Sequence, residues 1–370
     1  SLHNPQNQAL ERGALALGYH TSVIPRNTHG CIADGCRMCG YCSLGCQRGT
    51  KMSVVKAYLE RAYVRGARFL VETQVEKIHI RRGMAIGVEA YHRGKVVTVH
   101  AKIVVIAAGA LHTPALLLRS GIQHPHIGKH LHLHPTVAVA GVYPEPMHPW
   151  HGGMMTVVLS EHARLNGTWG FRLETPPIHS GLLAMALPWR SGKAHKHGML
   201  KAAHIGAYIV LTRDRDGGSI TLNKRGRPIA QYRVSAFDLA HLQRGIQEAA
   251  RIHWQAGATE LYLPHNHCEP VSLREGGLPA LERVLSALPS WRWRPNDYPL
   301  FSAHQMGTCR MGGFRDTHPV SPEGELYSVR HLFIADTSAF PEASGVNPML
   351  SVQALAHYIA QSIKARYTSG

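Results

Sequence analysis

The stretch IVVIAAGALHTPALLLRSGI, residues 103–122, carries the pattern on which the fold prediction rests. Its beginning, IVVI, is a β-branched apolar run, which is typical of a strand buried on both faces. Small residues and Gly109 follow, and LHTPALLLRSGI then has the pattern of a short helix with Pro114 in its first turn. A buried strand, a glycine-containing turn and a helix form the nucleotide crevice of a doubly wound sheet. The sequence therefore predicts an α/β fold with a nucleotide-binding domain.

The pattern changes at about residue 136. From there to residue 298, strand-like runs accompany one long amphipathic helix at 235–258, which predicts an α+β domain on an antiparallel sheet covered on one side. The last 70 residues return to a buried strand ending at Asp336 and a helix that follows Asn347. We therefore expect a first domain, an inserted domain and a C-terminal return to the first domain, at 1–135, 136–298 and 299–370.

Composition and charge narrow the classes of protein to consider. With 44% apolar and 17% charged residues, the 370-residue chain is globular rather than disordered, and it has no apolar run of 18 residues that would span a membrane. The net charge is +17, but no block of five like charges occurs, so we expect no nucleic-acid partner. A solvated basic surface is the simplest interpretation, and peripheral contact with an anionic membrane is the alternative. Either a cytoplasmic or a peripheral membrane location follows.

Four cysteines in CRMCGYCSLGC, residues 36–46, have the spacing C-x2-C-x2-C-x3-C. This is the bacterial ferredoxin spacing for an iron–sulfur cluster, but the proline that closes that motif is replaced by Gln47. Three interpretations stay open: a structural or disulfide-bonded loop, an iron–sulfur cluster, and a zinc site. A second candidate zinc site is HLHLHP, because His130, His132 and His134 would share one face of a strand. No carboxylate lies near them in the sequence, so we predict no metal there.

Five segments in order resemble one family. The stretches 104–122, HQMGTCRMGG (304–313) and IADTSAFPEASGVNPMLSVQALA (334–356) resemble the glucose–methanol–choline (GMC) flavin oxidoreductases. CGYCSLGCQRGTKMS (39–53) and IGKHLHLHP (127–135) narrow the resemblance to the long-chain (fatty) alcohol oxidase branch. The resemblance covers nearly the whole chain. It implies an FAD-binding domain of doubly wound type, with an inserted substrate domain.

The function implied by the resemblance is FAD-dependent oxidation of a primary, long-chain alcohol to the aldehyde. The expected partners are the alcohol and oxygen as electron acceptor, and the oligomeric state stays open. One alternative is a dehydrogenase of this type that passes electrons through an iron–sulfur cluster at the cysteine-rich loop (31–46) to a quinone or cytochrome. A second is a non-catalytic iron–sulfur electron carrier, and a third is an inert fragment.

One defining motif of the family does not occur in the chain. Family members open with a strand, a GxGxxG turn and a helix whose N-terminus binds the FAD pyrophosphate. No GxGxxG occurs here, and the chain begins at Ser1 in what reads as the middle of a domain. We therefore expect an N-terminally truncated sequence that lacks the first Rossmann half.

Two residues are predicted to act on the substrate. Alcohol oxidation needs a base for the hydroxyl proton, and histidine suits this role because its ordinary pKa is near neutral. The resemblance places the base at the first residue of the H-x-x-G-T motif, His304, and the residue that orients the substrate oxygen at Asn347 in the N-P-x-x-[ST] motif. Hydride would then pass from the same carbon to flavin N5. Asn347 would also cap the last helix, with Pro348 as its first residue.

Four further positions are expected to meet FAD, and all rest on the resemblance. Asp336 would contact the ribityl or pyrophosphate region, and Gly109 would let the backbone approach the ADP part. The backbone of Val75 would meet adenine, and Pro348 would pack near the flavin. His130 stands where the family usually has Asn, so the contact of that loop with the cofactor region stays open.

Overall fold

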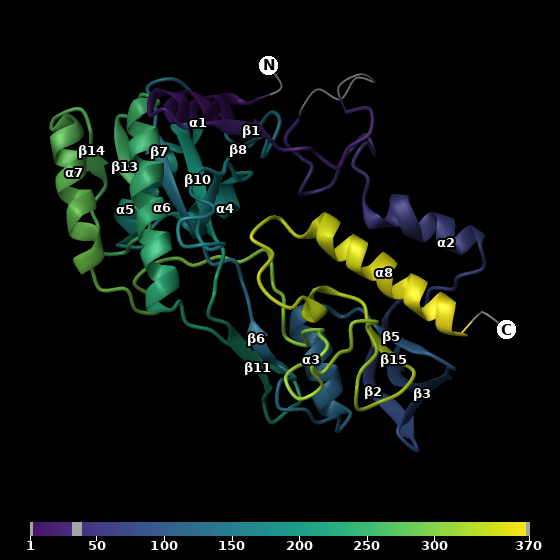
Figure 1. Cartoon of the computed structure of the whole chain (residues 1–370). Helices are drawn as coiled ribbons and strands as arrows, with labels where there is room; N and C mark the ends of the chain where they lie inside the picture. The colour runs from purple at the N-terminus through teal and green to yellow at the C-terminus, as the bar shows by residue number, and fades with distance from the viewer. Residues whose placement is uncertain (1–2, 32–38, 368–370) are drawn as a thin grey trace. The chain divides into compact units, whose positions relative to one another are not determined.

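The computed structural model describes residues 3–31 and 39–367. The chain forms two compact units, which are described separately (Figure 1). Unit 1 comprises Ser1–Arg68, Pro135–Thr212 and Ala236–Phe301, and unit 2 comprises Phe69–His134, Arg213–Ser235 and Ser302–Gly370. The segment predicted as an inserted domain thus supplies most of unit 1. The N-terminal 68 residues group with it, whereas 213–235 group with unit 2.

Unit 1 is built on a seven-stranded antiparallel sheet with the order β1-β8-β9-β10-β7-β13-β14. The central pair is the longest, and β10 aligns with β7 from Ile205↔Val142 to Leu211↔Thr136. The strands are β1 Thr21–Val23, β7 Thr136–Val142, β8 Val157–Leu159, β9 Phe171–Glu174, β10 Ile205–Thr212, β13 Glu260–Tyr262 and β14 Val271–Ser272. The antiparallel sheet expected from the strand-like runs is confirmed.

The long helix predicted from periodicity is α6, Ala236–Gln255, and it packs with α1, Pro5–Ala16, against this sheet (Figure 1). Its apolar face is completely buried at Leu242, Ile246, Ala249, Ala250 and Ile252. The other helices of unit 1 are a π-helical turn Val55–Leu59, α2 Glu60–Val64, α4 Ser180–Ala186, α5 Gly192–Leu200, α7 Gly277–Ala287 and the 3-10 turns Ala202–His204 and Leu288–Ser290. One amphipathic helix thus buries its apolar stripe on the sheet, as its sequence indicates.

The described residues of unit 2 form three small sheets. Two are antiparallel, with the orders β2-β3-β4 and β12-β11-β6, and the third is the parallel pair β5 and β15. Their bounds are β2 Thr73–Arg81, β3 Met84–His92, β4 Lys95–His100, β5 Val104–Ile106, β6 Lys129–Leu131, β11 Gly218–Leu222, β12 Pro228–Gln231 and β15 Leu332–Ile334. The helices are α3 Gly109–Arg119, a 3-10 turn Thr337–Ala339 and α8 Met349–Tyr367. The strand–turn–helix expected at 103–122 is therefore present as β5 and α3.

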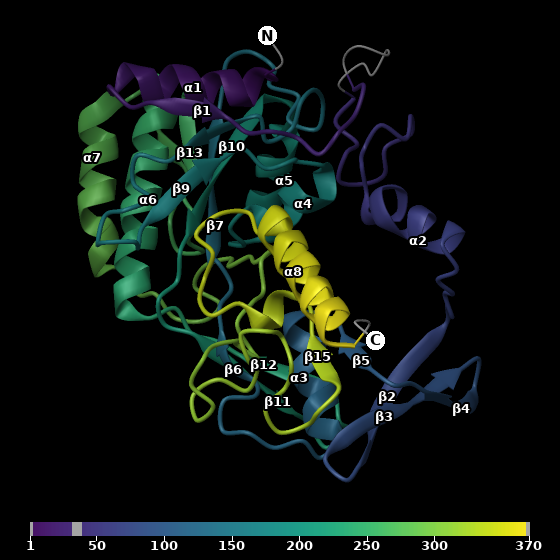
Figure 2. The ribbon, with the colours of Figure 1, turned by 45° about the vertical axis from the view of Figure 1, so that its right-hand side comes forward.

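Figure 2 shows the parallel strands β5 and β15 and the helix α8 of unit 2. These elements carry exposed apolar side chains. Val105, the middle residue of β5, is 48% exposed although its neighbours Val104 and Ile106 are buried. Within the described residues of α8, Ile359 is the only one that is buried. The described chain thus provides one pair of parallel strands. No helix in 3–31 or 39–367 has both the length and the apolarity needed to cross a membrane.

Candidate active site

His304 lies half-buried in unit 2 and contacts a second histidine. Its Nδ1 is 3.2 Å from Nδ1 of His134, and the rings meet edge to face at 89°. His134 is completely buried, and its Nε2 accepts a 3.0 Å hydrogen bond from the backbone N–H of Gly345. Burial lowers the pKa of His304, and it lowers the pKa of His134 to about 4, so both rings are neutral at pH 7. His134 thus connects His304 to the loop that leads into Asn347.

The buried carboxylate of Asp214 holds the loop that carries His134. It accepts hydrogen bonds from the backbone N–H of Leu133 at 2.9 Å and of His134 at 3.1 Å. The hydroxyl of Tyr232 donates to it at 3.0 Å. Burial raises the pKa of Asp214, but the nearby His132 and the hydrogen bonds outweigh burial, and the net effect lowers the pKa. The bonds stabilise the left-handed backbone of His134, whose φ is +48°.

The start of α8 differs slightly from the prediction. The helix begins at Met349, one residue later than expected, and the carbonyl of Pro348 accepts a 2.8 Å hydrogen bond from the N–H of Val352. Asn347 is exposed, and Pro348 is buried. Pro348 therefore precedes the first helical residue instead of being that residue.

Asp336 and Gly109, two predicted cofactor positions, are in direct contact. One oxygen of Asp336 accepts hydrogen bonds from the N–H of Gly109 at 2.9 Å and from the hydroxyl of Thr113 at 2.5 Å. The other accepts from the N–H of Ser338 at 2.7 Å. Gly109 has a φ of +76°, which a residue with a side chain rarely adopts. Since β5 and β15 are parallel neighbours, the turns after them meet at one edge of the sheet.

An open cavity of about 980 Å³ lies beside the predicted adenine position in unit 2. Its lining includes Val75, Ala108, His112, Arg119 and the turn at 225–228. Arg119 holds two of the walls together, because its guanidinium lies 3.5 Å from the carbonyl oxygen of Val75 and 3.1 Å from that of Gly226. Arg119 was not predicted as a site residue, because its only signal in the sequence is a basic residue in the last turn of the predicted helix.

The cysteine-rich run shows no metal site in the part that is described. Cys36 lies outside the described residues, and Cys39 and Cys46 are free thiols. Among residues 3–31 and 39–367, no three His, Cys, Asp or Glu side chains gather as metal ligands. Hydrogen bonds from Thr50 and from the backbone of Lys51 lower the pKa of Cys46 to about 7. The iron–sulfur alternatives have no support from these residues.

The histidine stretch also departs from its predicted form. Strand β6 ends at Leu131, so His130, His132 and His134 do not share one strand face. A carboxylate is close after all, because Asp214 lies 3.5 Å from Nδ1 of His132. His130 has a φ of +60°, a conformation in which Asn and His are both enriched, and this is a physical reason why either residue suits that position.

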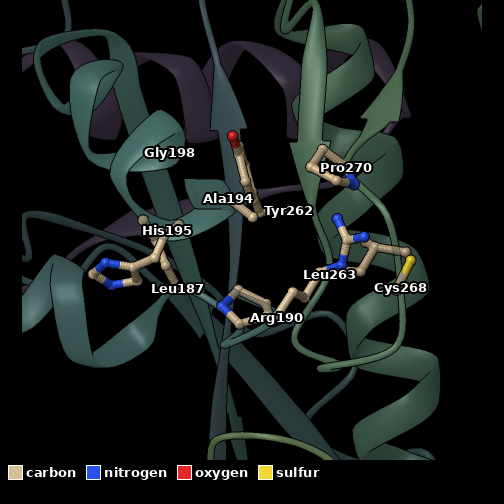
Figure 3. A pocket seen from close by; sticks show the side chains of 10 residues that line it. Leu187, Arg190, Ala194, His195, Gly198, Tyr262, Leu263, Cys268 and Pro270 are labelled. Atoms are coloured by element: carbon tan, nitrogen blue, oxygen red, sulfur yellow. The ribbon is translucent and has the colours of Figure 1, made fainter. Parts of the chain in front are cut away.

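A small cavity in unit 1 has none of the predicted site residues in its lining (Figure 3). Figure 3 shows Tyr262, Arg190, Cys268 and His195 around it. Its volume of about 20 Å³ is enough for about one water molecule. It is too small for an organic substrate.

Known sequences resemble the chain along most of its length. Family models described as GMC oxidoreductase match residues 1–136 and 214–356. The long-chain-alcohol oxidase FAO4A of Arabidopsis thaliana is 31% identical over 374 residues, covering 96% of this chain and 50% of that protein. A GMC-type oxidoreductase of Mycobacterium tuberculosis is 32% identical over 359 residues, covering 96% and 54%. The chain spans about half the length of the curated relatives it matches.

Solved structures support the same fold. Pyridoxine 4-oxidase from Mesorbium loti superimposes with a TM-score of 0.69 at 19% identity, covering 99% of this chain and 71% of that one. Formate oxidase of Aspergillus oryzae gives a TM-score of 0.67 at 15% identity, covering 98% and 70%. The family predicted from the sequence is therefore confirmed: this chain belongs to the GMC oxidoreductase family.

Proposed function

We propose that this protein takes part in the FAD-dependent oxidation of a primary, long-chain alcohol to the aldehyde, with oxygen as electron acceptor. The names of the Arabidopsis relatives support this substrate class, and their similarity extends over nearly the whole chain. The observation that carries the proposal is the His304 site itself. The neutral, half-buried imidazole of His304 contacts His134, and His134 accepts a hydrogen bond from Gly345 in the loop that leads into Asn347.

His304 accepts the hydroxyl proton of the alcohol in this proposal, and Asn347 orients the alcohol oxygen. Burial lowers the pKa of His304 and so favours the neutral ring, which a proton acceptor requires. Pro348 lies next to Asn347 and would pack near the flavin. Bound FAD would supply the acceptor for the hydride that leaves the same carbon.

The residues present fit one part of FAD. The cavity of about 980 Å³ beside Val75 and Ala108 has the volume of a small-molecule site. Val75 would meet adenine there, and Gly109 and Asp336 would adjoin the phosphate and ribityl region. Gly109 suits a close approach of the cofactor. A Cβ at this position would project into open space, and its absence leaves that space to the cofactor.

The exposed faces of unit 2 suggest what completes the FAD-binding domain. Half-exposed Val105 on β5 and the largely exposed α8 are the surfaces that a further strand–helix layer would cover. We infer that they pack against the first Rossmann half of the family, which carries GxGxxG. In this arrangement unit 2 belongs to the FAD-binding domain and the sheet of unit 1 to the substrate domain.

Flavin reduction tests the catalytic assignment. The chain is produced together with the GxGxxG-bearing half inferred above, loaded with FAD and mixed anaerobically with 1-dodecanol, and the flavin absorbance is followed. The wild type is expected to bleach, and His304→Ala should bleach about 10²- to 10⁴-fold more slowly, the usual contribution of a general base. Asn347→Ala should also slow the reaction, since the alcohol oxygen would lose its orienting group.

A matched control is His100→Ala, which removes an exposed histidine at the end of β4. This variant should reduce FAD at the wild-type rate. If His304→Ala bleaches as fast as His100→Ala, His304 is not the proton acceptor. If the FAD-loaded wild type is not reduced by any primary alcohol, the substrate assignment is wrong.

A further inference from the structure

The hydrogen bond between Gly345 and His134 determines which nitrogen of His134 carries a proton. A backbone N–H can only donate, so Nε2 of His134 must present its lone pair to Gly345 at 3.0 Å. A neutral imidazole carries one proton, and that proton must then lie on Nδ1. The pKa of His134, lowered to about 4 by burial, keeps the ring neutral. His134 is thus a donor at Nδ1.

The donor at Nδ1 of His134 points at His304. The two Nδ1 atoms are 3.2 Å apart, so one nitrogen must donate and the other must accept. Since His134 donates, Nδ1 of His304 accepts, and the single proton of neutral His304 is left on Nε2. We propose that His134 is a positioning residue that holds His304 as the Nε2–H tautomer. The inference rests on the proposed function, in which His304 meets the alcohol.

Two neighbouring residues, Asp214 and Arg213, hold the loop of His134 and the loop of Gly345 in place. Asp214 binds the backbone N–H of His134, and Arg213 donates through Nε to the carbonyl of Ala343 at 2.9 Å. Gly345 has a φ of +68°, and a Cβ there would lie 2.9 Å from Cδ of Arg213. The loop therefore passes close to Arg213 only because residue 345 lacks a side chain. This packing maintains the distance from Gly345 to His134.

The tautomer has a chemical consequence. With Nδ1 engaged by His134, only Nε2 of His304 can meet a substrate, and among the described residues no group hydrogen-bonds to it. The Nε2–H tautomer donates to the alcohol oxygen and cannot accept its proton. Proton acceptance requires the other tautomer, with its proton on Nδ1 and its lone pair on Nε2. The alcohol O–H bond then breaks, the oxygen keeps the electron pair, an N–H bond forms at Nε2, and His304 becomes an imidazolium with a proton on each nitrogen. His304 would then carry a proton on Nδ1, facing Nδ1–H of His134.

His134 consequently governs when His304 becomes a base. In the resting arrangement, His304 binds the alcohol as a donor. The base form is reached when the contact between the two Nδ1 atoms opens. Replacing His134 by a side chain without a donor at that position should therefore favour the base form.

The test is a measurement of tautomers in the full chain without cofactor. Protein labelled with 15N-histidine is examined by long-range 1H–15N correlation spectra at pH 7.5, and the His304 signals are assigned by their loss in His304→Gln. We expect Nε2 protonated and Nδ1 unprotonated. His134→Asn keeps an amide donor near the Nδ1 position and should preserve this pattern. His134→Gln places its amide near the Nε2 position instead, so the hydrogen bond to His304 is lost. The ratio of the Nε2–H to the Nδ1–H tautomer of His304 should then fall roughly tenfold, the effect of losing one hydrogen bond.

The outcomes separate the two proposals. A wild-type spectrum with His304 protonated on Nδ1 overturns the positioning role, whatever the variants show. Equal tautomer ratios in His134→Asn and His134→Gln, with both variants folded by circular dichroism, also overturn it. Because no turnover is measured, the tautomer result stands or falls independently of the loss of flavin reduction in His304→Ala.

Discussion

At the scale of single residues, Asp336 shows how one carboxylate joins two turns. Three hydrogen bonds reach it, from Gly109 and Thr113 after β5 and from Ser338 after β15. Asp336, Thr113 and Ser338 are buried and Gly109 is partly buried, and a buried donor that loses its acceptor is costly. The same carboxylate that would adjoin the cofactor therefore also stabilises the edge where the cofactor would bind.

We predict that Asp336→Asn lowers the free energy of unfolding by about 2–3 kcal/mol, because hydrogen bonds to a charged group are worth about 1.5–3 kcal/mol. In the asparagine variant an NH2 group replaces one carboxylate oxygen. This NH2 group would face either Ser338 N–H or the pair Gly109 N–H and Thr113 hydroxyl, which also donate, so those hydrogen bonds are lost. Urea denaturation measures the change. Asp316→Asn, at an exposed position, is the control and should differ from the wild type by less than about 0.5 kcal/mol. Equal stability of the two variants would contradict the prediction.

At the scale of elements, the packing of α6 on the sheet of unit 1 depends on a glycine. Gly245 lies in the middle of α6, and a Cβ there would be 2.1 Å from Cγ1 of Val210 on β10. It would also be 3.2 Å from Cδ2 of Phe171 on β9. Val210 and Phe171 are both buried, so neither side chain can move aside into solvent. The helix lies this close to the sheet because residue 245 has no side chain.

We predict that Gly245→Ala destabilises unit 1 by up to about 2 kcal/mol, because overpacking usually costs about 1–3 kcal/mol. Alanine is better than glycine in a helix by about 1 kcal/mol, which offsets only part of that cost. Thermal and urea unfolding of the variant measure the net effect. Gly192→Ala, at the first residue of α5 where no atom lies within 4 Å of the added Cβ, is the matched control and should be neutral or slightly stabilising. A more stable Gly245→Ala would show that the helix can move away from the sheet without loss.

At the scale of the whole molecule, buried neutral histidines make stability depend on pH. Burial lowers the pKa of His253 in unit 1 to about 3, and that of His130 and His134 in unit 2 to about 4. His253 is enclosed by a hydrogen bond with the hydroxyl of Tyr143 at 2.8 Å and another with the carbonyl of Val139 at 3.1 Å. In the unfolded chain each of these histidines has its ordinary pKa of about 6.5. Below that pH, the unfolded state binds more protons than the folded state.

We therefore predict that the free energy of unfolding is constant near pH 7.5 and falls as the pH decreases from about 6.5 towards 4. Each fully buried histidine contributes a loss of at most about 1.4 kcal/mol per pH unit in this window, until its folded pKa is reached. Urea denaturation at pH 7.5, 6.0, 5.0 and 4.5 measures the slope. Unchanged stability from pH 7.5 to 5.0 would contradict the prediction, since it would mean that the histidines titrate normally in the folded chain.

Local patterns in the sequence were enough to predict several elements. The apolar periodicity of 235–258 predicted α6, and IVVI followed by Gly109 predicted β5 and α3. Each of these signals comes from residues within one or two turns of the chain. The family, and through it His304, Asn347, Val75, Gly109, Asp336 and Pro348 as proposed site residues, also came from short contiguous motifs.

The sequence by itself therefore determined the α/β class, the antiparallel sheet with its covering helix, and the family. Only the tertiary structure decided that Gly109 donates to Asp336, that Asp214 lies against the loop of His134, and that His134 stands between Gly345 and His304. Residues 80 to 227 positions apart make these contacts, and the intervening strands and helices set which of them meet. A backbone hydrogen bond or a ring contact across such a separation leaves no periodic signal in the sequence, because it depends on where the packing of whole elements places each loop.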